Sequence, residues 1–527
     1  MICRSFYLLL TALLASPYAY AQNGDAPPQV WYNLDYETDG VYGMSIDRAY
    51  EALEGRTPTR QVVVAVIDSG VDITHEDLQG QIWTNGDELA GNSVDDDGNG
   101  YVDDVSGWNF IGGPDGQNVS SDSFELARQV SRLRAQFRGV DTTALSGPAA
   151  DDYAHWQELE AELADERAEF EGIAGQMAGI QMAVHQAHSV LSDHFEREDY
   201  AIADVDAIRS TDQDVLQARD ILLFLDANGL TVSDLDKQVE YVTTRLEFGL
   251  NPDFDPRNIV GDDFSDVNER FYGNADVSGP DPGHGTAVAG VIAAVRGNGI
   301  GIDGVAPNVR IMPVRTVPNG DERDKDVANA IRYAVDNGAD IINMSFGKGI
   351  SPRKDAVDVA VRYAVERGVL LIHAAGNDGS DLNIKPNFPT RRLDDGTEAA
   401  NWLEVGASRW DDALVASFSN YGAEKVDVFA PGASIYSLEP GNSYGSHDGT
   451  SLAAPLVSGV AAMLMAYFPE LEAPQVRQIL LDSATRFTLD VQVPGDDTVN
   501  TSFASLSITG AVINAYNAVE MAGRQPD

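Results

Sequence analysis

Apolar runs that end in polar residues constrain the fold of this 527-residue chain more than any other feature. Residues Val62 to Ile67 are all apolar, and the run stops at Asp68. A short continuous run of this kind is typical of a strand buried on both faces, as in a parallel sheet covered by helices. Further strand-like runs are Val309–Val314, Asp340–Met344, Gly368–Ala374, Trp402–Ala407 and Lys425–Phe429.

Helical patterns alternate with several of these runs, notably over residues 326–337 and 355–367. Strands that alternate with helices predict an α/β fold with a doubly wound, mainly parallel sheet. In such sheets, functional residues gather beyond the carboxyl ends of the strands. We therefore expect the functional residues directly after the strand-like runs.

Three short islands carry candidate catalytic residues in the order Asp, His, Ser. They are V-I-D-S-G around Asp68, H-G-T-A-V-A-G from His284 and G-T-S-L-A-A-P around Ser451. A serine hydroxyl needs a base to act as a nucleophile, and the base in turn needs an orienting carboxylate. Ser451 also opens a helix-like run, where free N–H groups and the helix dipole favour negative charge. Taken alone, that serine could equally be an ordinary helix cap.

The three islands together resemble the signatures of the subtilases, the subtilisin-like serine peptidases. The resemblance covers roughly residues 60–112 and 281–522. It implies a subtilisin-like fold and a serine endopeptidase in which Ser451 attacks the scissile carbonyl and His284 shuttles the proton. Asp68 would orient His284.

A fourth island, G-V-L-L-I-H-A-A-G-N-D-G over residues 368–379, matches the segment that holds an oxyanion donor in subtilases. The resemblance places that role on the side-chain amide of Asn377. The alternative is that residues 377–379 form an ordinary turn, because Asn-Asp-Gly is a typical turn sequence. The position directly after a buried strand favours the functional interpretation.

Substrate-binding residues also follow from the resemblance. Residues 344–347 match a segment that lines the primary specificity pocket and pairs with the peptide backbone, and residues 374–376 match the opposite wall. Val317–Asp321 matches the edge that pairs with residues upstream of the cut. Pairing through main chain predicts broad specificity. The predicted substrate-binding residues are Ser345, Phe346, Gly347, Ala374, Ala375 and Gly376.

Calcium is the expected cofactor, with a structural role. The segment 95–104 places oxygen ligands at alternate positions around a glycine, as in an EF-hand loop. Ser106 stands where that loop has its last glutamate, so an acidic surface turn remains the alternative. The resemblance adds a second site at Asp77 and Asn298. The predicted ligands in the loop are Asp95, Asp97, Asn99, Tyr101 and Asp103.

The charge of the chain limits its partners. It is −48, from 83 acidic and 35 basic side chains, with no basic stripe for phosphates. We therefore expect no nucleic-acid partner, but protein or peptide substrates. Such acidity suits high solubility, calcium binding or a salty medium. The sequence indicates no oligomeric state.

Residues 1–21 read as a secretory signal, with Arg4, an apolar run and an Ala-Tyr-Ala cleavage site. A short membrane anchor is the alternative, although the run is too short to span a bilayer. We expect export to the periplasm or the extracellular space, and no membrane association after the signal is removed. The only cysteine is Cys3, so the exported part would have no disulfide.

Residues 119–261 interrupt the α/β pattern and predict an all-α insertion between Asp68 and His284. Residues 153–196 predict one long helix, for which a break near 172–179 is the alternative. Residues 211–228 and 233–248 predict two more helices, which favours an antiparallel helical hairpin. The expected organisation is a signal (1–21), an N-terminal extension (22–59), the first part of the peptidase domain (60–118), the insertion (119–261), the second part (262–522) and a tail (523–527).

A rival function belongs to another class: a non-catalytic exported adaptor that binds partners through the acidic insertion. The complete set of catalytic residue types favours the peptidase.

Overall fold

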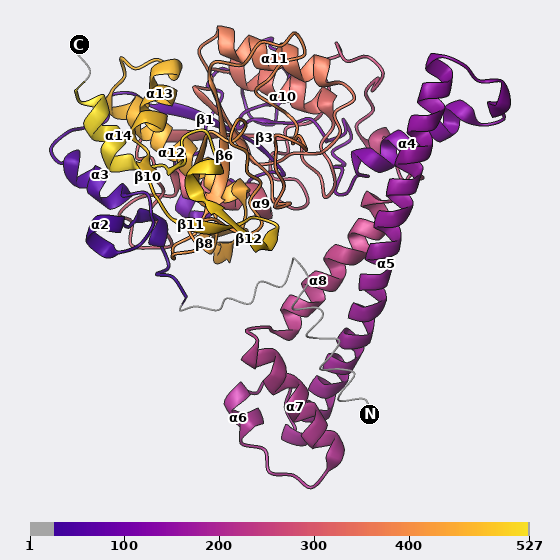
Figure 1. Cartoon of the computed structure of the whole chain (residues 1–527). Helices are drawn as coiled ribbons and strands as arrows, with labels where there is room; N and C mark the ends of the chain where they lie inside the picture. The colour runs from indigo at the N-terminus through magenta and orange to yellow at the C-terminus, as the bar shows by residue number, and fades with distance from the viewer. Residues whose placement is uncertain (1–25, 525–527) are drawn as a thin grey trace. The chain divides into compact units, whose positions relative to one another are not determined.

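The structure, a computed structural model, describes residues 26–524. The predicted signal, 1–21, and the last residues of the predicted tail lie outside the described residues. Two compact units are present (Figure 1): an α/β unit, Pro27–Glu125 with residues 255–524, and a helical unit, Leu126–Phe254. Residues 119–125 and 255–261, which we had assigned to the insertion, belong to the α/β unit.

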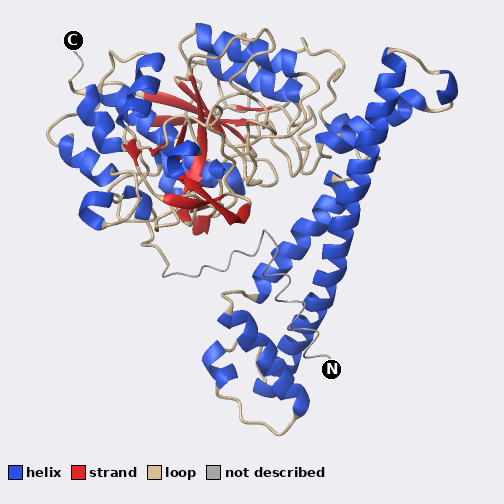
Figure 2. Cartoon of the chain, viewed as in Figure 1, coloured by secondary structure: helices blue, strands red, loops and turns tan. Residues whose placement is uncertain are grey.

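A nine-stranded sheet forms the centre of the α/β unit, in the order β10-β13-β7-β6-β5-β4-β1-β3-β2. Its pairs are parallel except for β10 with β13 at one edge, which confirms the predicted sheet. Figure 2 shows these strands enclosed by helices. The strands of the unit are β1 (Val62–Asp68), β2 (Trp108–Asn109), β3 (Val309–Arg315), β4 (Ile341–Met344), β5 (Leu370–Ala374), β6 (Trp402–Ser408), β7 (Val428–Pro431), β8 (Ile435–Glu439), β9 (Ser443–His447), β10 (Thr485–Arg486), β11 (Asp490–Val493), β12 (Asp496–Ser502) and β13 (Ala511–Val512).

The direction of strand order reverses at β1, which pairs with β3 on one side and β4 on the other. Asp68, the last residue of β1, therefore lies where two crossover connections diverge. Ligands of open α/β sheets bind at such switch points.

Helices cover both faces of the sheet, and this explains the continuous apolar runs. Along β1, Val64 and Val66 pack into one core with α9 and α12, whereas Ala65 and Ile67 pack into a second core with α10 and α11. The helices of the unit are α2 (Tyr36–Asp39), α3 (Ile46–Ala52), α9 (Gly283–Ala293), α10 (Asp324–Asp336), α11 (Lys354–Glu366), α12 (Thr450–Tyr467), α13 (Ala473–Ser483) and α14 (Ala515–Ala522). Short 3₁₀ segments lie at Trp31–Asn33, Glu76–Leu78, Arg257–Ile259 and Phe503–Ser505.

Helix α12 is long and apolar enough to cross a membrane by length and composition, with a mean hydropathy of 1.5. However, 94% of it is buried inside the structure. Burial of this extent is typical of the central helix of a globular core.

The segment before β1 is an integral layer of the α/β unit. Trp31 and Tyr32 are fully buried, and the Trp31 indole donates to the carbonyl of Ala433 at 3.0 Å. Ser45 precedes α3, but its hydroxyl does not cap the helix: its φ is 58° and its Oγ donates to Asp35.

Helices account for nearly all of the helical unit: α4 (Glu125–Phe137), α5 (Pro148–Phe195), α6 (Ile202–Asp206), α7 (Gln213–Ala227) and α8 (Val232–Thr244), with a 3₁₀ turn at Thr142–Ala144 and a π-helical turn at Arg245–Gly249. Asp236, early in α8, contacts Gln181 and His185 late in α5, whereas Leu250, after α8, accepts from Arg167 earlier in α5. Helix α8 therefore runs antiparallel to α5.

The predicted long helix is confirmed and the alternative of a break is wrong, because α5 continues through Gly172, Gly175 and Gly179. Glycine costs a helix about 1 kcal/mol relative to alanine. Buried side chains on both sides of these glycines, such as Phe170 and Ile180, hold the helix in place by packing.

One other predicted element differs in extent. Strand β7 begins at Val428 rather than at Lys425, because the amides of Lys425 and Val426 both bond to the Gly422 carbonyl and form a turn.

Candidate functional site

Asp68 and His284 meet at the carboxyl end of β1. Asp68 closes the buried strand, and His284 lies in the first turn of α9. The His284 Nδ1 and Asp68 Oδ1 atoms are 2.7 Å apart, and the Ser69 amide donates to the same carboxylate oxygen at 2.7 Å. The Asp68 carboxylate is almost fully buried, whereas the imidazole is partly exposed. A buried carboxylate on Nδ1 fixes the ring so that Nε2 is available for proton transfer.

The electrostatics of the pair favour the protonated imidazole. Loss of hydration opposes the charge on His284, but the attraction and hydrogen bond of Asp68 outweigh it, and Asp281 adds to the effect. The pKa of His284 is therefore raised above its ordinary value.

Ser451 lies in the first turn of α12, after a glycine that has no room for a side chain. Gly449 has a φ of 150°, and a Cβ there would lie 2.7 Å from Ser451 Oγ and 3.5 Å from Asn377 Nδ2. The serine hydroxyl and the asparagine amide thus border the same small space. No hydrogen bond joins Ser451 Oγ to His284 in the described part of the chain. Such contacts often tighten only when substrate is bound.

Thr450 fixes the orientation of the Asn377 amide. Its main-chain N–H and its hydroxyl both donate to Asn377 Oδ1, at 2.8 and 2.9 Å. Because the amide oxygen is occupied, Nδ2 is the atom turned toward Ser451. This role of Thr450 was not predicted, although the residue stands inside the Ser451 island.

The predicted substrate-binding residues form two segments that meet near Ser451. Ser345 Oγ donates to the main-chain carbonyl of Ser451 at 2.9 Å. From the other segment, the Gly376 amide donates to Thr450 Oγ1 at 3.0 Å. A residue missed in the sequence, Asn387, lies between the two segments: its Nδ2 is 3.2 Å from the carbonyls of Ala374 and Ala375, and it packs on Gly347.

The edge predicted at Val317–Asp321 is partly occupied by the chain itself. The Asn319 amide donates to the Ser120 carbonyl at 2.9 Å, and the Asp122 amide donates to the Asn319 carbonyl at 3.1 Å. These groups of Asn319 are therefore unavailable to a peptide.

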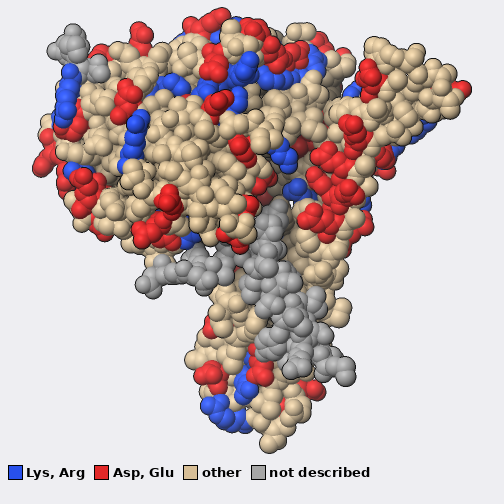
Figure 3. All heavy atoms as spheres, in the orientation of Figure 1, with Lys and Arg blue, Asp and Glu red and all other residues tan. Residues whose placement is uncertain are grey.

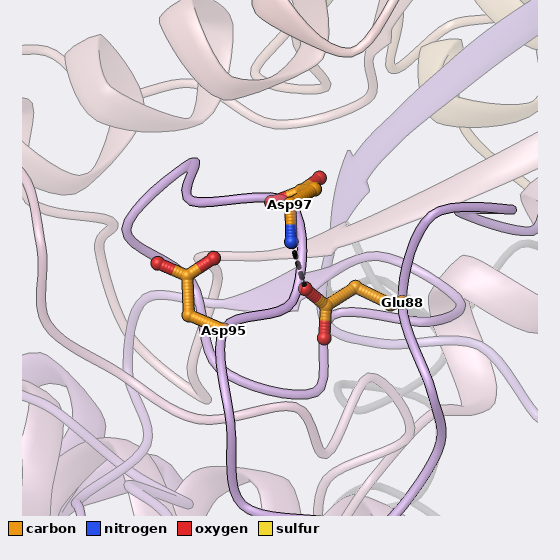
Figure 4. A group of neighbouring side chains, drawn as sticks. All are labelled: Glu88, Asp95 and Asp97. Carbon is orange, nitrogen blue, oxygen red and sulfur yellow. Dashed lines mark hydrogen bonds between the residues drawn. The ribbon is translucent and has the colours of Figure 1, made fainter.

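The acidic loop brings together some of the predicted calcium ligands. One oxygen each of Glu88, Asp95 and Asp97 lies within 4.8 Å of the others (Figure 4), and the Asp97 amide donates to Glu88. Three carboxylates this close repel one another unless a cation lies between them. Oxygen ligands suit Ca²⁺, so the group fits calcium.

Other predicted ligands of the loop are placed differently. The Asp103 carboxylate accepts from the amides of Asn92 and Ser93, and the Tyr101 side chain packs among aromatic rings. Asn99 donates its side-chain amide to Asp97 and Asp104. Glu88 was not predicted, because it lies seven residues before the loop motif begins.

The predicted second site brings its two residues together. Asn298 Nδ2 donates to Asp77 Oδ1 at 2.6 Å, and the Ile302 amide donates to Asp77 Oδ2. Asp77 is fully buried, and this burial raises the pKa of its carboxyl despite the hydrogen bonds. Both oxygens of Asp77 accept from N–H donors in this arrangement, so a cation held by Asp77 and Asn298 would have to replace these hydrogen bonds.

The parallel sheet and its switch point define the class of the protein, an open α/β fold, and comparison with known proteins identifies the family. A model of the subtilase family, Peptidase_S8, matches residues 59–505. The chain belongs to the subtilase family.

Three curated relatives illustrate this similarity. The chain is 39% identical over 239 residues to the thermophilic serine proteinase of Bacillus sp. (strain AK1), 40% over 207 residues to subtilisin DY of Bacillus licheniformis, and 39% over 215 residues to thermitase of Thermoactinomyces vulgaris. These matches cover 45%, 38% and 41% of this chain. The chain spans about half of the first relative (52%) and 70% of each of the other two.

Proposed function

We propose that this protein is an exported serine endopeptidase of broad specificity. The observation that carries the proposal is the joint geometry of two contacts: the 2.7 Å contact between His284 and Asp68, and the Asn377 amide held beside Ser451 by Thr450. Membership of the subtilase family and similarity to serine peptidases support it.

The reaction follows from these placements. Ser451 Oγ attacks the scissile carbonyl carbon and transfers its proton to His284 Nε2, while Asp68 stabilises the imidazolium. The oxyanion accepts hydrogen bonds from Asn377 Nδ2 and the Ser451 N–H. Collapse of the tetrahedral intermediate breaks the peptide bond, and the imidazolium protonates the leaving amine. Water then hydrolyses the acyl-enzyme, and the same groups act in reverse order.

Substrates would bind as extended peptides between the segments Ser345–Gly347 and Ala374–Gly376. Recognition by main chain depends little on side chains, which supports broad specificity. Calcium would be held by Glu88, Asp95 and Asp97, and by Asp77 with Asn298, in a structural role. These contacts would link loops that have no disulfide, because Cys3 is the only cysteine.

Export is supported by the pattern of residues 1–21 and by the acidic composition. The face drawn in Figure 3 carries acidic patches on both units. A net charge far from zero favours solubility outside the cell.

A casein digest with a Ser451→Ala control tests the proposal. We expect cleavage by the native chain and none by the variant. The adaptor alternative predicts no cleavage by either, and cleavage by both would remove Ser451 from the reaction.

A further inference from the structure

A buried polar network lies directly behind one substrate-binding segment. His373, in β5, is completely buried. Its Nδ1 atom is 2.8 Å from Glu404 Oε1, and its Nε2 atom is 2.8 Å from the main-chain carbonyl oxygen of Phe346. The second oxygen of Glu404 accepts from the Trp402 indole at 2.9 Å. No step of the proposed reaction uses any of these side chains.

The partners of His373 define what each atom does. A main-chain carbonyl can only accept a hydrogen bond, so Nε2 of His373 donates to Phe346. On the other side of the ring, a proton between Nδ1 and Oε1 joins His373 to Glu404, and the Trp402 indole satisfies the second oxygen of Glu404. Burying such a pair is costly unless every polar atom has a partner, and here each one has.

The polar network lies where the pairing between β4 and β5 ends. Strand β4 ends at Met344, which lies opposite His373 in the β4–β5 register. Beyond that point, a hydrogen bond from the His373 side chain to the Phe346 carbonyl replaces the main-chain hydrogen bonds between the two strands. The other end of the segment is fixed by reciprocal bonds between Lys348 and Phe388, at 3.1 and 2.8 Å.

The His373 ring holds the carbonyl of Phe346 inward. Successive carbonyls of an extended chain face opposite ways, so an extended segment here would turn the carbonyls of Ser345 and Gly347 away from His373. Within residues 26–524, the main-chain N–H and C=O of Gly347 form no hydrogen bond. They remain available to an extended peptide.

We propose that His373, held by Glu404, is a positioning residue that orients the segment Ser345–Gly347 for main-chain pairing with substrate. It thereby sets the affinity for long peptides without touching the reacting atoms. The inference rests on the proposed endopeptidase function.

The central test is a double variant of the full chain, His373→Phe with Glu404→Leu. Replacing both partners by apolar groups leaves no unpaired buried charge, so the fold is expected to persist. The variant is assayed with an extended peptide amide, with a single-residue ester and with a small organophosphate that reacts at the active serine.

The value of kcat/KM for the extended peptide should fall by about tenfold or more, mainly through KM, as expected for loss of a charge-assisted hydrogen bond. Turnover of the ester and the rate of organophosphate reaction should stay within about twofold, because neither needs the peptide-pairing edge. Equal losses on peptide and ester, or no loss on either, would overturn the positioning role.

Two further variants keep the test decisive. Trp402→Phe removes one donor to Glu404 and should shift the peptide-to-ester ratio in the same direction by a smaller factor, even if the double variant fails to fold.

Asp340→Asn is the matched control: that carboxylate accepts from the Val63 amide at the amino end of β4. It should lower stability and leave the ratio unchanged. A change of the ratio in Asp340→Asn, or none in Trp402→Phe, contradicts the proposal. Failure of the proposed function itself would appear separately, as native protein that cleaves no substrate.

Discussion

The two units of this protein bury their side chains in different ways. In the α/β unit, the central strands are buried on both faces, and β5 and β6 have no exposed residue. In the helical unit, α5 buries a single seam over its 48 residues: Leu159, Leu163, Phe170, Met177, Ile180, Val184, Ala187 and Leu191. A seam requires only a spacing of three, four or seven residues. In the sheet, by contrast, individual residues at the strand ends differ in role, and the candidate catalytic residue Asp68 lies at one of these ends.

The largest expected effect is a loss of kcat in variants of the α/β unit that has no counterpart in the helical unit. Ser451→Ala or His284→Ala should each reduce kcat by about 10⁶-fold, the scale known for this triad in subtilisin. The double variant should be little worse, since the residues act as a unit. Asp236→Asn, which changes a carboxylate contacting His185 in the helical unit, should leave kcat unaltered. Additive losses in log rate would contradict the shared role.

The oxyanion donor gives the next largest effect. Asn377→Ala should lower kcat by about 10²–10³-fold, the loss on removing one such donor in a member of this family, with little change in KM. Asn228→Ala, a helix-end asparagine of the helical unit, serves as the control. A variant changed mainly in KM would show that Asn377 binds the ground state.

Calcium removal should reveal which unit depends on metal. An ion that binds only native protein adds about 2.7 kcal/mol at 100 times its Kd, which for a unit of this size corresponds to a Tm decrease on the order of 3–5 °C on chelation. Glu88→Gln should reduce this sensitivity, and the exposed Glu37→Gln should not. Calorimetry that shows no change with chelator would mean that neither proposed site binds calcium.

A smaller effect concerns pH. His284 must be neutral to accept the Ser451 proton, and its pKa is raised by Asp68 and, less strongly, by Asp281. Activity should therefore fall as pH decreases through this raised value. Asp281→Asn removes a negative charge that favours the imidazolium, so the acid limb of the kcat/KM profile should move to lower pH. Asp141→Asn in the helical unit should leave the limb in place. A shift to higher pH would contradict the assigned electrostatics.

The smallest effect is expected from loss of the helical unit. Arg323 donates to both Asp122 and Asp255, so the two connections to this unit are held by one side chain of the α/β unit. Replacing residues 126–254 by a short Gly/Ser bridge should keep hydrolysis of a small peptide within about threefold, because no proposed catalytic group is removed. Cleavage of folded proteins should change if the unit controls access. A folded deletion variant that cleaves no small peptide would show that the unit builds the site.

Sequence was most informative where an element and a chemical role coincide. The apolar run before Asp68 predicted both the buried strand and the residue at its end, and the Ser451 and Asn377 islands likewise combined a backbone setting with a reactive group. The geometry at Asn377 depends on Thr450, whose two hydrogen bonds could not be read from residue types.

Sequence was least informative where distant segments meet. Glu88 joins Asp95 and Asp97 only because the loop folds back, and His373 meets Glu404 only because β5 and β6 are adjacent. Glycines in α5 predicted a break that packing overrides, since intrinsic propensity is weaker than tertiary contact. Very short strands such as β2 and β13 carry too few residues for a periodic signal.

The most direct test of the central claim is to locate the nucleophile chemically. The full chain is treated with a small organophosphate until caseinolysis stops, and peptide mass spectrometry maps the adduct. We expect one adduct per chain, on Ser451, formed in proportion to the activity lost, and none in His284→Ala. Complete inactivation with the adduct on another residue, or full activity with Ser451 modified, would contradict it.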